Sequence, residues 1–196
     1  MKMNKLPEPL VIPDFLAENE LKAVWKEVDF LSNTLFTPEQ TFSARDAVTN
    51  EFLKKNLGVS LVQVMDLNYS TIARTFNRVM SDAFVAEALT VDPFYKYLKL
   101  INHSRYVLHY YTDGDFYKEH MDTFVISGVF FLHREPKKFT GGELVFPETD
   151  IEVTPNNNTF VLFPSASKHY VKPVAMDNSD EGFGRYSIAQ FLTINI

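Results

Sequence analysis

Apolar residues near the N-terminus recur with the spacing of a helix. They lie three or four positions apart over residues 21–31: Leu21, Val24, Trp25, Val28 and Leu31. This pattern predicts an amphipathic helix that ends near residue 31, with Asp14 or Asn19 as its N-cap. The preceding LVIPDF predicts a short extended segment, because Pro13 disfavours a helical conformation for Ile12.

A second helical pattern covers residues 61–89, with Asn68 or Ser70 as a possible cap. Its apolar stripe predicts core packing: Ile72, Phe76, Val79, Met80 and Phe84. Residues 32–60 between the two patterns are polar and irregular, so we expect a loop that covers another part of the protein. Nothing before residue 100 suggests chemistry.

After residue 102, short aromatic and β-branched runs alternate with turn residues, as is typical of an all-β sandwich or barrel. The runs predict strands near 104–112, 116–122, 124–132, 142–146, 150–154, 158–163, 167–174 and 185–195. We therefore expect a mainly β fold with flanking α, in which a jelly roll follows N-terminal helices. The length of 196 residues favours a single domain, 1–196, with 1–100 as helical support and 101–196 as the jelly-roll core.

Composition and charge exclude several classes of protein. Hydrophobic residues make up 45% and charged residues 22%, as in folded proteins. The net charge of -6 lacks the basic excess of nucleic-acid-binding proteins, so we expect no nucleic-acid partner. No apolar run is long enough to span a membrane, so we expect no membrane association. Pro7, Pro9 and Pro13 interrupt the run that a signal peptide needs, which favours a cytoplasmic location. No pattern indicates an oligomeric state.

Candidate metal ligands are confined to imidazoles and carboxylates, because the chain has no Cys. If YTDGDFYKEHMD continues as a strand to its last residue, His120 and Asp122 share a face. His169 offers a second imidazole, and Arg185 follows on the last predicted strand. Two His and one carboxylate on one side of a metal are typical of non-haem Fe(II) oxygenases, which leave the opposite side open. The same three groups also hold catalytic zinc.

Four segments of the second half surround these residues in a fixed order. They are Tyr111-x-x-Gly114-x-x-Tyr117-x-x-His120-x-Asp122, Gly141-Gly142-Glu143-Leu144-x-Phe146, Phe163-Pro164 ahead of His169, and Arg185-Tyr186-Ser187-Ile188. In order and spacing, residues 104–196 resemble the 2-oxoglutarate and iron(II)-dependent dioxygenases of the prolyl 4-hydroxylase-like type. The resemblance implies a double-stranded β-helix (jelly-roll) catalytic core with the metal site at its mouth.

The resemblance also implies a role for each group. His120, Asp122 and His169 would hold Fe(II), and Arg185 would pair with the distal carboxylate of the cosubstrate 2-oxoglutarate. Ser187 would add a hydroxyl to that carboxylate, and Tyr111 or Tyr117 another hydrogen bond. O2 is the oxidant, with ascorbate as an optional addition. The expected activity is hydroxylation of a substrate C–H, with a peptidyl proline as one candidate, and release of succinate and CO2.

Two positions depart from the family pattern. The step from His169 to Arg185 is longer than is common, and Phe131 stands where several protein prolyl hydroxylases carry a Tyr. A free amino acid, another protein side chain or a small metabolite would also suit these motifs. Nucleic-acid demethylating oxygenases are disfavoured, because Phe191 stands where they usually carry a second Arg.

The rival hypotheses are a non-catalytic jelly-roll binding module and a zinc hydrolase. In the first, Arg185 would form a structural ion pair, for instance with Glu143 or Asp150. The three remaining imidazoles have no partner at ligand spacing, and we expect ordinary core or surface positions for them: His103, His109 and His133.

Overall fold

The computed structural model describes residues 7–41, 45–46, 48–177 and 179–195. In this part of the chain, helices are concentrated before residue 101 and strands after it. The strands form a six-stranded sheet, a five-stranded sheet and a two-stranded pair, and each pairing is antiparallel. This arrangement confirms the predicted mainly β fold with N-terminal helices.

The larger sheet has a long central strand that carries part of the cavity wall. In spatial order its strands are β1 (Leu10–Ile12), β10 (Thr159–Pro164), β6 (Ile126–Leu132), β13 (Arg185–Thr193), β4 (His103–Tyr111) and β3 (Leu57–Ser60). β13 pairs with β4 on one side and β6 on the other. Because side chains alternate along a strand, Arg185 and Ser187 share one face of β13, and Tyr186 and Ile188 share the other.

The smaller sheet lies opposite and contributes His120 and His169. Its order is β2 (Lys54–Lys55), β5 (Phe116–His120), β11 (His169–Val171), β8 (Leu144–Phe146) and β9 (Ile151–Val153). The separate pair consists of β7 (Phe139–Gly141) and β12 (Val174–Met176). Apolar side chains, among them Phe131, Phe146 and Phe163, pack together between the sheets.

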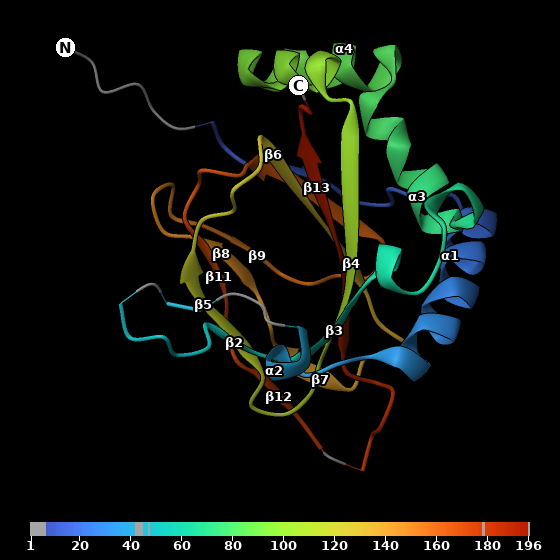
Figure 1. Cartoon of the computed structure of the whole chain (residues 1–196), viewed down its shortest axis with the longest axis vertical. Helices are drawn as coiled ribbons and strands as arrows, with labels where there is room; N and C mark the ends of the chain where they lie inside the picture. Colours follow the sequence, from blue (N-terminus) through green and yellow to red (C-terminus); the bar gives the residue numbers. More distant parts are fainter. Residues whose placement is uncertain (1–6, 42–44, 47, 178, 196) are drawn as a thin grey trace.

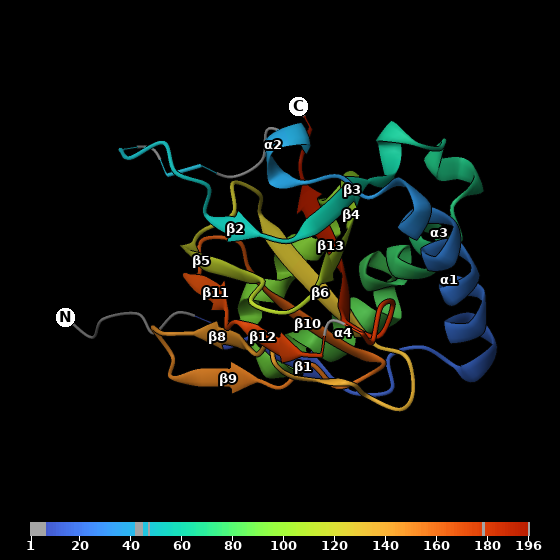
Figure 2. The same ribbon diagram turned by 90° about the horizontal axis from the view of Figure 1, so that it is seen from below.

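Helices cover the outer face of the larger sheet. The α-helices are α1 (Glu18–Leu31), α2 (Pro38–Thr41), α3 (Thr71–Phe76) and α4 (Asp82–Val91), and the 3-10 helices are η1 (Ser32–Thr34), η2 (Leu61–Gln63), η3 (Leu67–Tyr69), η4 (Asn77–Met80) and η5 (Pro93–Leu100). Figures 1 and 2 show α1 and α3 on one side of the β4–β13 pair and the smaller sheet on the other. Val28, Phe76 and Ile188 join the helices to the sheet in one buried core. No helix in the described ranges is long and apolar enough to cross a membrane.

The helical region predicted over 61–89 is broken into short pieces. Side chains at three positions accept backbone N–H groups and start a new helix each time: Asp66 for η3, Ser70 for α3 and Ser81 for α4. Such residues favour helix starts over helix interiors. The predicted core packing is confirmed for Ile72, Phe76 and Val79, which are fully buried.

The prediction of a plain loop over 32–60 is wrong, because this segment contributes η1, α2, β2 and β3. β3 pairs with β4 of the larger sheet, and β2 pairs with β5 of the smaller one. Two further predicted strands differ from the structure. The strand predicted over 142–146 starts only at Leu144, after Gly142, which adopts a φ of +73° between β7 and β8. The strand predicted over 167–174 is interrupted at Pro173, which has no N–H to donate and separates β11 from β12.

Candidate active site

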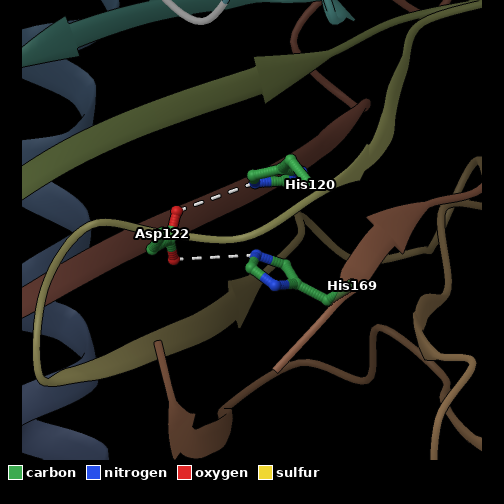
Figure 3. A group of neighbouring side chains, drawn as sticks. All are labelled: His120, Asp122 and His169. Atoms are coloured by element: carbon green, nitrogen blue, oxygen red, sulfur yellow. Dashed lines mark ion pairs between the residues drawn. The ribbon is translucent and has the colours of Figure 1, made fainter. Parts of the chain in front are cut away.

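His120 and His169 face each other across the β5–β11 strand pair. Their backbones are direct partners in the register, and their ring centroids lie 4.2 Å apart. Cross-strand partners project to the same face of a sheet, so both imidazoles enter the space between the two sheets. Figure 3 shows the rings converging on the carboxylate of Asp122.

Asp122 lies beyond the end of β5, so the predicted strand over 116–122 is two residues too long. Its backbone N–H donates to the Ser165 carbonyl at 2.9 Å, which holds this turn against the segment that follows β10. Oδ1 lies 3.7 Å from Nε2 of His120, and Oδ2 lies 3.6 Å from Nε2 of His169. One ligand atom from each residue lies within 4.8 Å of the others, so the structure brings the three predicted ligands together.

The hydrogen bonds of the two imidazoles leave their Nε2 atoms free for a metal. Nδ1 of His120 lies 2.9 Å from the Lys118 carbonyl, and Nδ1 of His169 lies 2.9 Å from the Ser167 carbonyl. A carbonyl only accepts, so each Nδ1 carries the proton and each Nε2 presents its lone pair. Burial, assisted by His169, lowers the pKa of His120 to about 3, so that ring is neutral at physiological pH.

The Asp122 carboxylate is held from behind by the Ser127 hydroxyl, which in turn contacts the Ser165 hydroxyl. Ser127 donates to Oδ2 at 2.6 Å, and its oxygen lies 2.8 Å from that of Ser165. Burial raises the pKa of Asp122, because the charged form loses its hydration there. A cation beside this carboxylate would favour its ionised form.

Arg185 is fully buried on the cavity face of β13, and one nitrogen of its guanidinium has no partner among the described residues. Nε donates to the Gly142 carbonyl at 2.8 Å, Nη1 donates to Ser187 Oγ at 3.2 Å, and Nη2 makes no hydrogen bond within that part of the chain. The guanidinium carbon lies 4.7 Å from the centroid of the Tyr111 ring. Within the described residues no carboxylate forms an ion pair with Arg185. The structural ion pair with Glu143 or Asp150 is therefore wrong.

Both candidate tyrosines line the cavity, in different places. Tyr111 lies beneath Arg185, and burial raises its pKa, so its phenol keeps the proton. Tyr117 stacks on His120 with ring centroids 3.7 Å apart. Tyr110 faces the helices and packs on Tyr186. Tyr111, rather than its neighbour Tyr110, therefore faces the cavity.

His109 and Lys54 are cavity residues that the sequence did not identify. His109, expected in an ordinary position, lines the cavity beside Tyr111, and its Nδ1 lies 3.3 Å from the amide nitrogen of Asn56. Lys54 enters from β2. The strand period could have placed His109 on the same face as Tyr111. A strand as short as β2 leaves no pattern to detect. His103 and His133 are absent from the described lining, as expected.

The cavity has a volume of about 750 Å³, which is ample for a small ligand beside a metal. Two imidazoles and a carboxylate are the donors that suit Fe(II) with open positions. The unpartnered Nη2 of Arg185 suits a carboxylate oxygen, since buried guanidinium groups normally use their donors. The residues present therefore fit both Fe(II) and 2-oxoglutarate.

Known proteins resemble this chain in sequence and in fold. Residues 106–193 match the sequence profile of the 2OG-Fe(II) oxygenase superfamily. An uncharacterized PKHD-type hydroxylase of Synechocystis sp. is 27% identical over 97 residues, which are 40% of this chain and 32% of that protein. The chain therefore spans about a third of the length of this curated relative.

Two solved structures share the fold at low sequence identity. A prolyl-4-hydroxylase of Pseudomonas putida has a TM-score of 0.65 and 16% identity, over 96% of this chain and 93% of that one. A prolyl hydroxylase of Trichoplax adhaerens, solved with a hypoxia inducible factor peptide fragment, has a TM-score of 0.61 and 13% identity, over 95% and 84%. With the metal-ligand geometry, these findings lead to one conclusion: residues 106–193 are similar to the 2OG-Fe(II) oxygenase superfamily, and the chain has the jelly-roll fold of prolyl 4-hydroxylases.

Proposed function

We propose that this protein hydroxylates a C–H bond of its substrate in a reaction that consumes 2-oxoglutarate and O2 and requires Fe(II). The observation that carries the proposal is the convergence of His120, Asp122 and His169 with their metal-facing atoms free. When bound, Fe(II) and 2-oxoglutarate supply the oxidation: one oxygen atom of O2 enters the succinate that forms with CO2, and the other becomes the product hydroxyl.

The chain's own residues orient the reactants. His120, Asp122 and His169 hold the metal from one side, because all three reach it from the smaller sheet and the turn after β5. Arg185 and Ser187 bind the distal carboxylate of 2-oxoglutarate, with the free Nη2 donating to it. Tyr111 donates a further hydrogen bond from beneath, since its phenol stays protonated. The apolar wall that includes Phe131 keeps water from Arg185.

A proline residue is the first candidate for the hydroxylated group. It is suggested by the shared fold with hydroxylases that are named for proline, one of them solved with a peptide. A proline-containing peptide incubated with the Fe(II)-loaded protein, 2-oxoglutarate and O2 should gain one oxygen atom on proline, detected by mass spectrometry. The matched peptide with alanine in place of proline should remain unchanged. Oxidation of both peptides alike, or of neither, would remove proline from the proposal.

Neither rival reading accounts for the site as well. A zinc hydrolase needs a general base beside its ligands, yet Asp122 is the sole carboxylate in the described lining of the cavity. A binding module without cofactors gives no role to a guanidinium buried with an unpartnered Nη2.

The direct test of the reaction is succinate release. It should depend on both Fe(II) and 2-oxoglutarate, and it should fall to background in His120→Ala and Asp122→Ala. Lys168→Ala is a suitable control, because Lys168 precedes a ligand but its ammonium pairs with Glu119 outside the cavity. Undiminished turnover in either ligand variant would contradict the proposal.

A further inference from the structure

The cavity is basic although the protein as a whole is acidic. The charged side chains in the described part of its lining are Arg45, Lys54, Arg105, Arg185 and Asp122, in a chain of net charge -6. Cations gathered in a cleft of low dielectric raise the local concentration of anions. The cavity is therefore suited to ligands that bring negative charge.

The proposed cofactors do not use all of this positive charge. A divalent metal with Asp122 leaves one positive charge, Arg185 adds another, and the two carboxylates of 2-oxoglutarate neutralise both. Lys54, Arg45 and Arg105 remain. No ion pair joins any of these three to a carboxylate among the described residues. A second anion would offset the charge of Lys54, which is buried, whereas Arg45 and Arg105 are exposed to solvent.

Lys54 is the cation placed to meet that anion near the metal. Its residue is only 9% exposed, and its ammonium lies 5.6 Å from the centroid of Tyr117, the ring that stacks on His120. Neither a hydrogen bond nor an ion pair of this ammonium occurs in the part of the chain that the structure describes. Burial lowers the pKa of Lys54 to about 8, which reflects a charge taken from water without a counter-ion.

The outer part of the cavity offers an apolar surface. Phe124 and Phe191 stack with ring centroids 4.7 Å apart, and the Arg105 guanidinium lies 5.8 Å from the Phe124 centroid. A ligand whose anionic group reaches Lys54 would place its apolar body against these rings.

We propose that Lys54 is the specificity-determining residue of this site and binds the carboxylate of a small anionic substrate, whose apolar part lies toward Phe124 and Phe191. This inference rests on the proposed function. A single ammonium beside neutral His109 matches the single charge of a carboxylate better than the double charge of a phosphate. A free amino acid, or a proline at the carboxyl end of a peptide, meets this requirement.

The test uses the full chain loaded with Mn(II) and the unreactive cosubstrate analogue N-oxalylglycine. The probes are N-acetyl-L-proline, N-acetyl-L-leucine and N-acetyl-L-phenylalanine, each against its neutral amide. Mn(II) speeds the relaxation of probe protons that come close to it, so NMR titration reports binding near the metal without any turnover. At least one acid should half-saturate the wild type at a concentration about tenfold or more below its amide.

The variants assign the preference to one side chain. Lys54→Met should remove the difference between acid and amide, while Mn(II) and N-oxalylglycine still bind as in wild type. Lys54→Gln serves if the Met variant does not fold. Lys55→Met is the matched control and should keep the preference, since Lys55 is exposed and pairs with Asp115 at 3.2 Å outside the cavity.

Several results would overturn the proposal. They are equal binding of acids and amides, a preference that survives in Lys54→Met, and no binding by any acid up to about 10 mM. Loss of N-oxalylglycine binding in Lys54→Met would assign Lys54 to the cosubstrate instead. Tighter binding of a single-stranded dT8 oligonucleotide than of every acid would assign the cations to phosphates. If the wild type binds no Mn(II), the proposed function fails. The Lys54 proposal is then tested separately, by comparing how far each acid and its amide raise the thermal unfolding midpoint of the metal-free protein.

Discussion

The backbone of Gly142 packs directly against the side chain of Arg185 and accepts a hydrogen bond from it. The Gly142 carbonyl accepts the Nε–H of Arg185 at 2.8 Å, and a Cβ on Gly142 would lie 2.6 Å from Arg185 Cδ. The φ of +73° at Gly142 also lies in the left-handed region that favours glycine. The lack of a side chain at Gly142 therefore provides the space in which the Arg185 side chain lies.

Gly142→Ala should weaken the binding of 2-oxoglutarate about tenfold or more, because the new methyl group displaces Arg185. Titration calorimetry on the Mn(II)-loaded protein measures this dissociation constant. Gly182→Ala is the control: its φ is +80°, but its Cβ would meet nothing nearer than Arg134 Nε at 4.0 Å. Both variants carry similar backbone strain, so equal affinities would show that Arg185 does not bind the cosubstrate.

Ser127→Ala should weaken metal binding about 10–100-fold, as is typical when a group that orients a metal ligand is lost. The variant removes the 2.6 Å hydrogen bond to Asp122. Ser165→Ala should have a smaller effect, because Ser165 Oγ contacts Ser127 at 2.8 Å and reaches Asp122 only through it. Competition with a metal-binding dye measures both constants. Wild-type affinity in Ser127→Ala would show that this hydroxyl does not orient the ligand.

Glu27 joins α1 to the start of α3 and should matter for stability alone. Its buried carboxylate accepts hydrogen bonds from Ser70 Oγ at 2.6 Å, Thr71 N at 2.6 Å and Ile72 N at 3.1 Å. Glu27→Ala should lower the free energy of unfolding by about 2–4 kcal/mol, since it leaves buried donors unpaired. Urea titration measures this loss. Glu18→Ala on the exposed face of the same helix should change little, and metal affinity should persist in both variants.

His109 should make stability depend on pH. Burial keeps the pKa of folded His109 well below its ordinary value, so the unfolded chain takes up this proton first as pH falls below about 6.5. Stability from this group is thus present above that pH and is lost below it, by up to about 1.4 kcal/mol per pH unit. Urea titrations of the metal-free protein at about pH 7 and about pH 5 should show a smaller loss in His109→Gln than in wild type. Equal losses would contradict the burial of an uncharged ring.

The sequence predicted the convergence of the metal ligands more accurately than it predicted where the strands end. His120 and Asp122 converge as expected even though β5 ends at His120, because the Ser165 carbonyl holds the turn in place. The strand period of two correctly predicted that His120 and Asp122 lie close together. In the structure, however, Asp122 is placed by the turn after β5 and not by the strand. The excess length between His169 and Arg185 lies between β12 and β13, outside the paired strands.

Lys54 could not be predicted as a site residue. It lies in a two-residue strand inside a polar segment, and its place in the cavity depends on pairing with Tyr117, more than sixty positions away. Local periodicity carries no signal for such a contact. The breaks between the helices within 61–89 could have been predicted from the sequence, because Asp66, Ser70 and Ser81 are residue types that commonly cap helices.

Anaerobic titration tests the central claim, that His120, Asp122 and His169 hold an iron to which 2-oxoglutarate binds. Wild-type protein should take up one Fe(II) per chain, and added 2-oxoglutarate should then produce a weak visible charge-transfer band. Asp122→Ala, with its fold verified by circular dichroism, should show neither. A wild-type protein without the band, or an Asp122→Ala variant with the same iron content and the same band, would contradict the account.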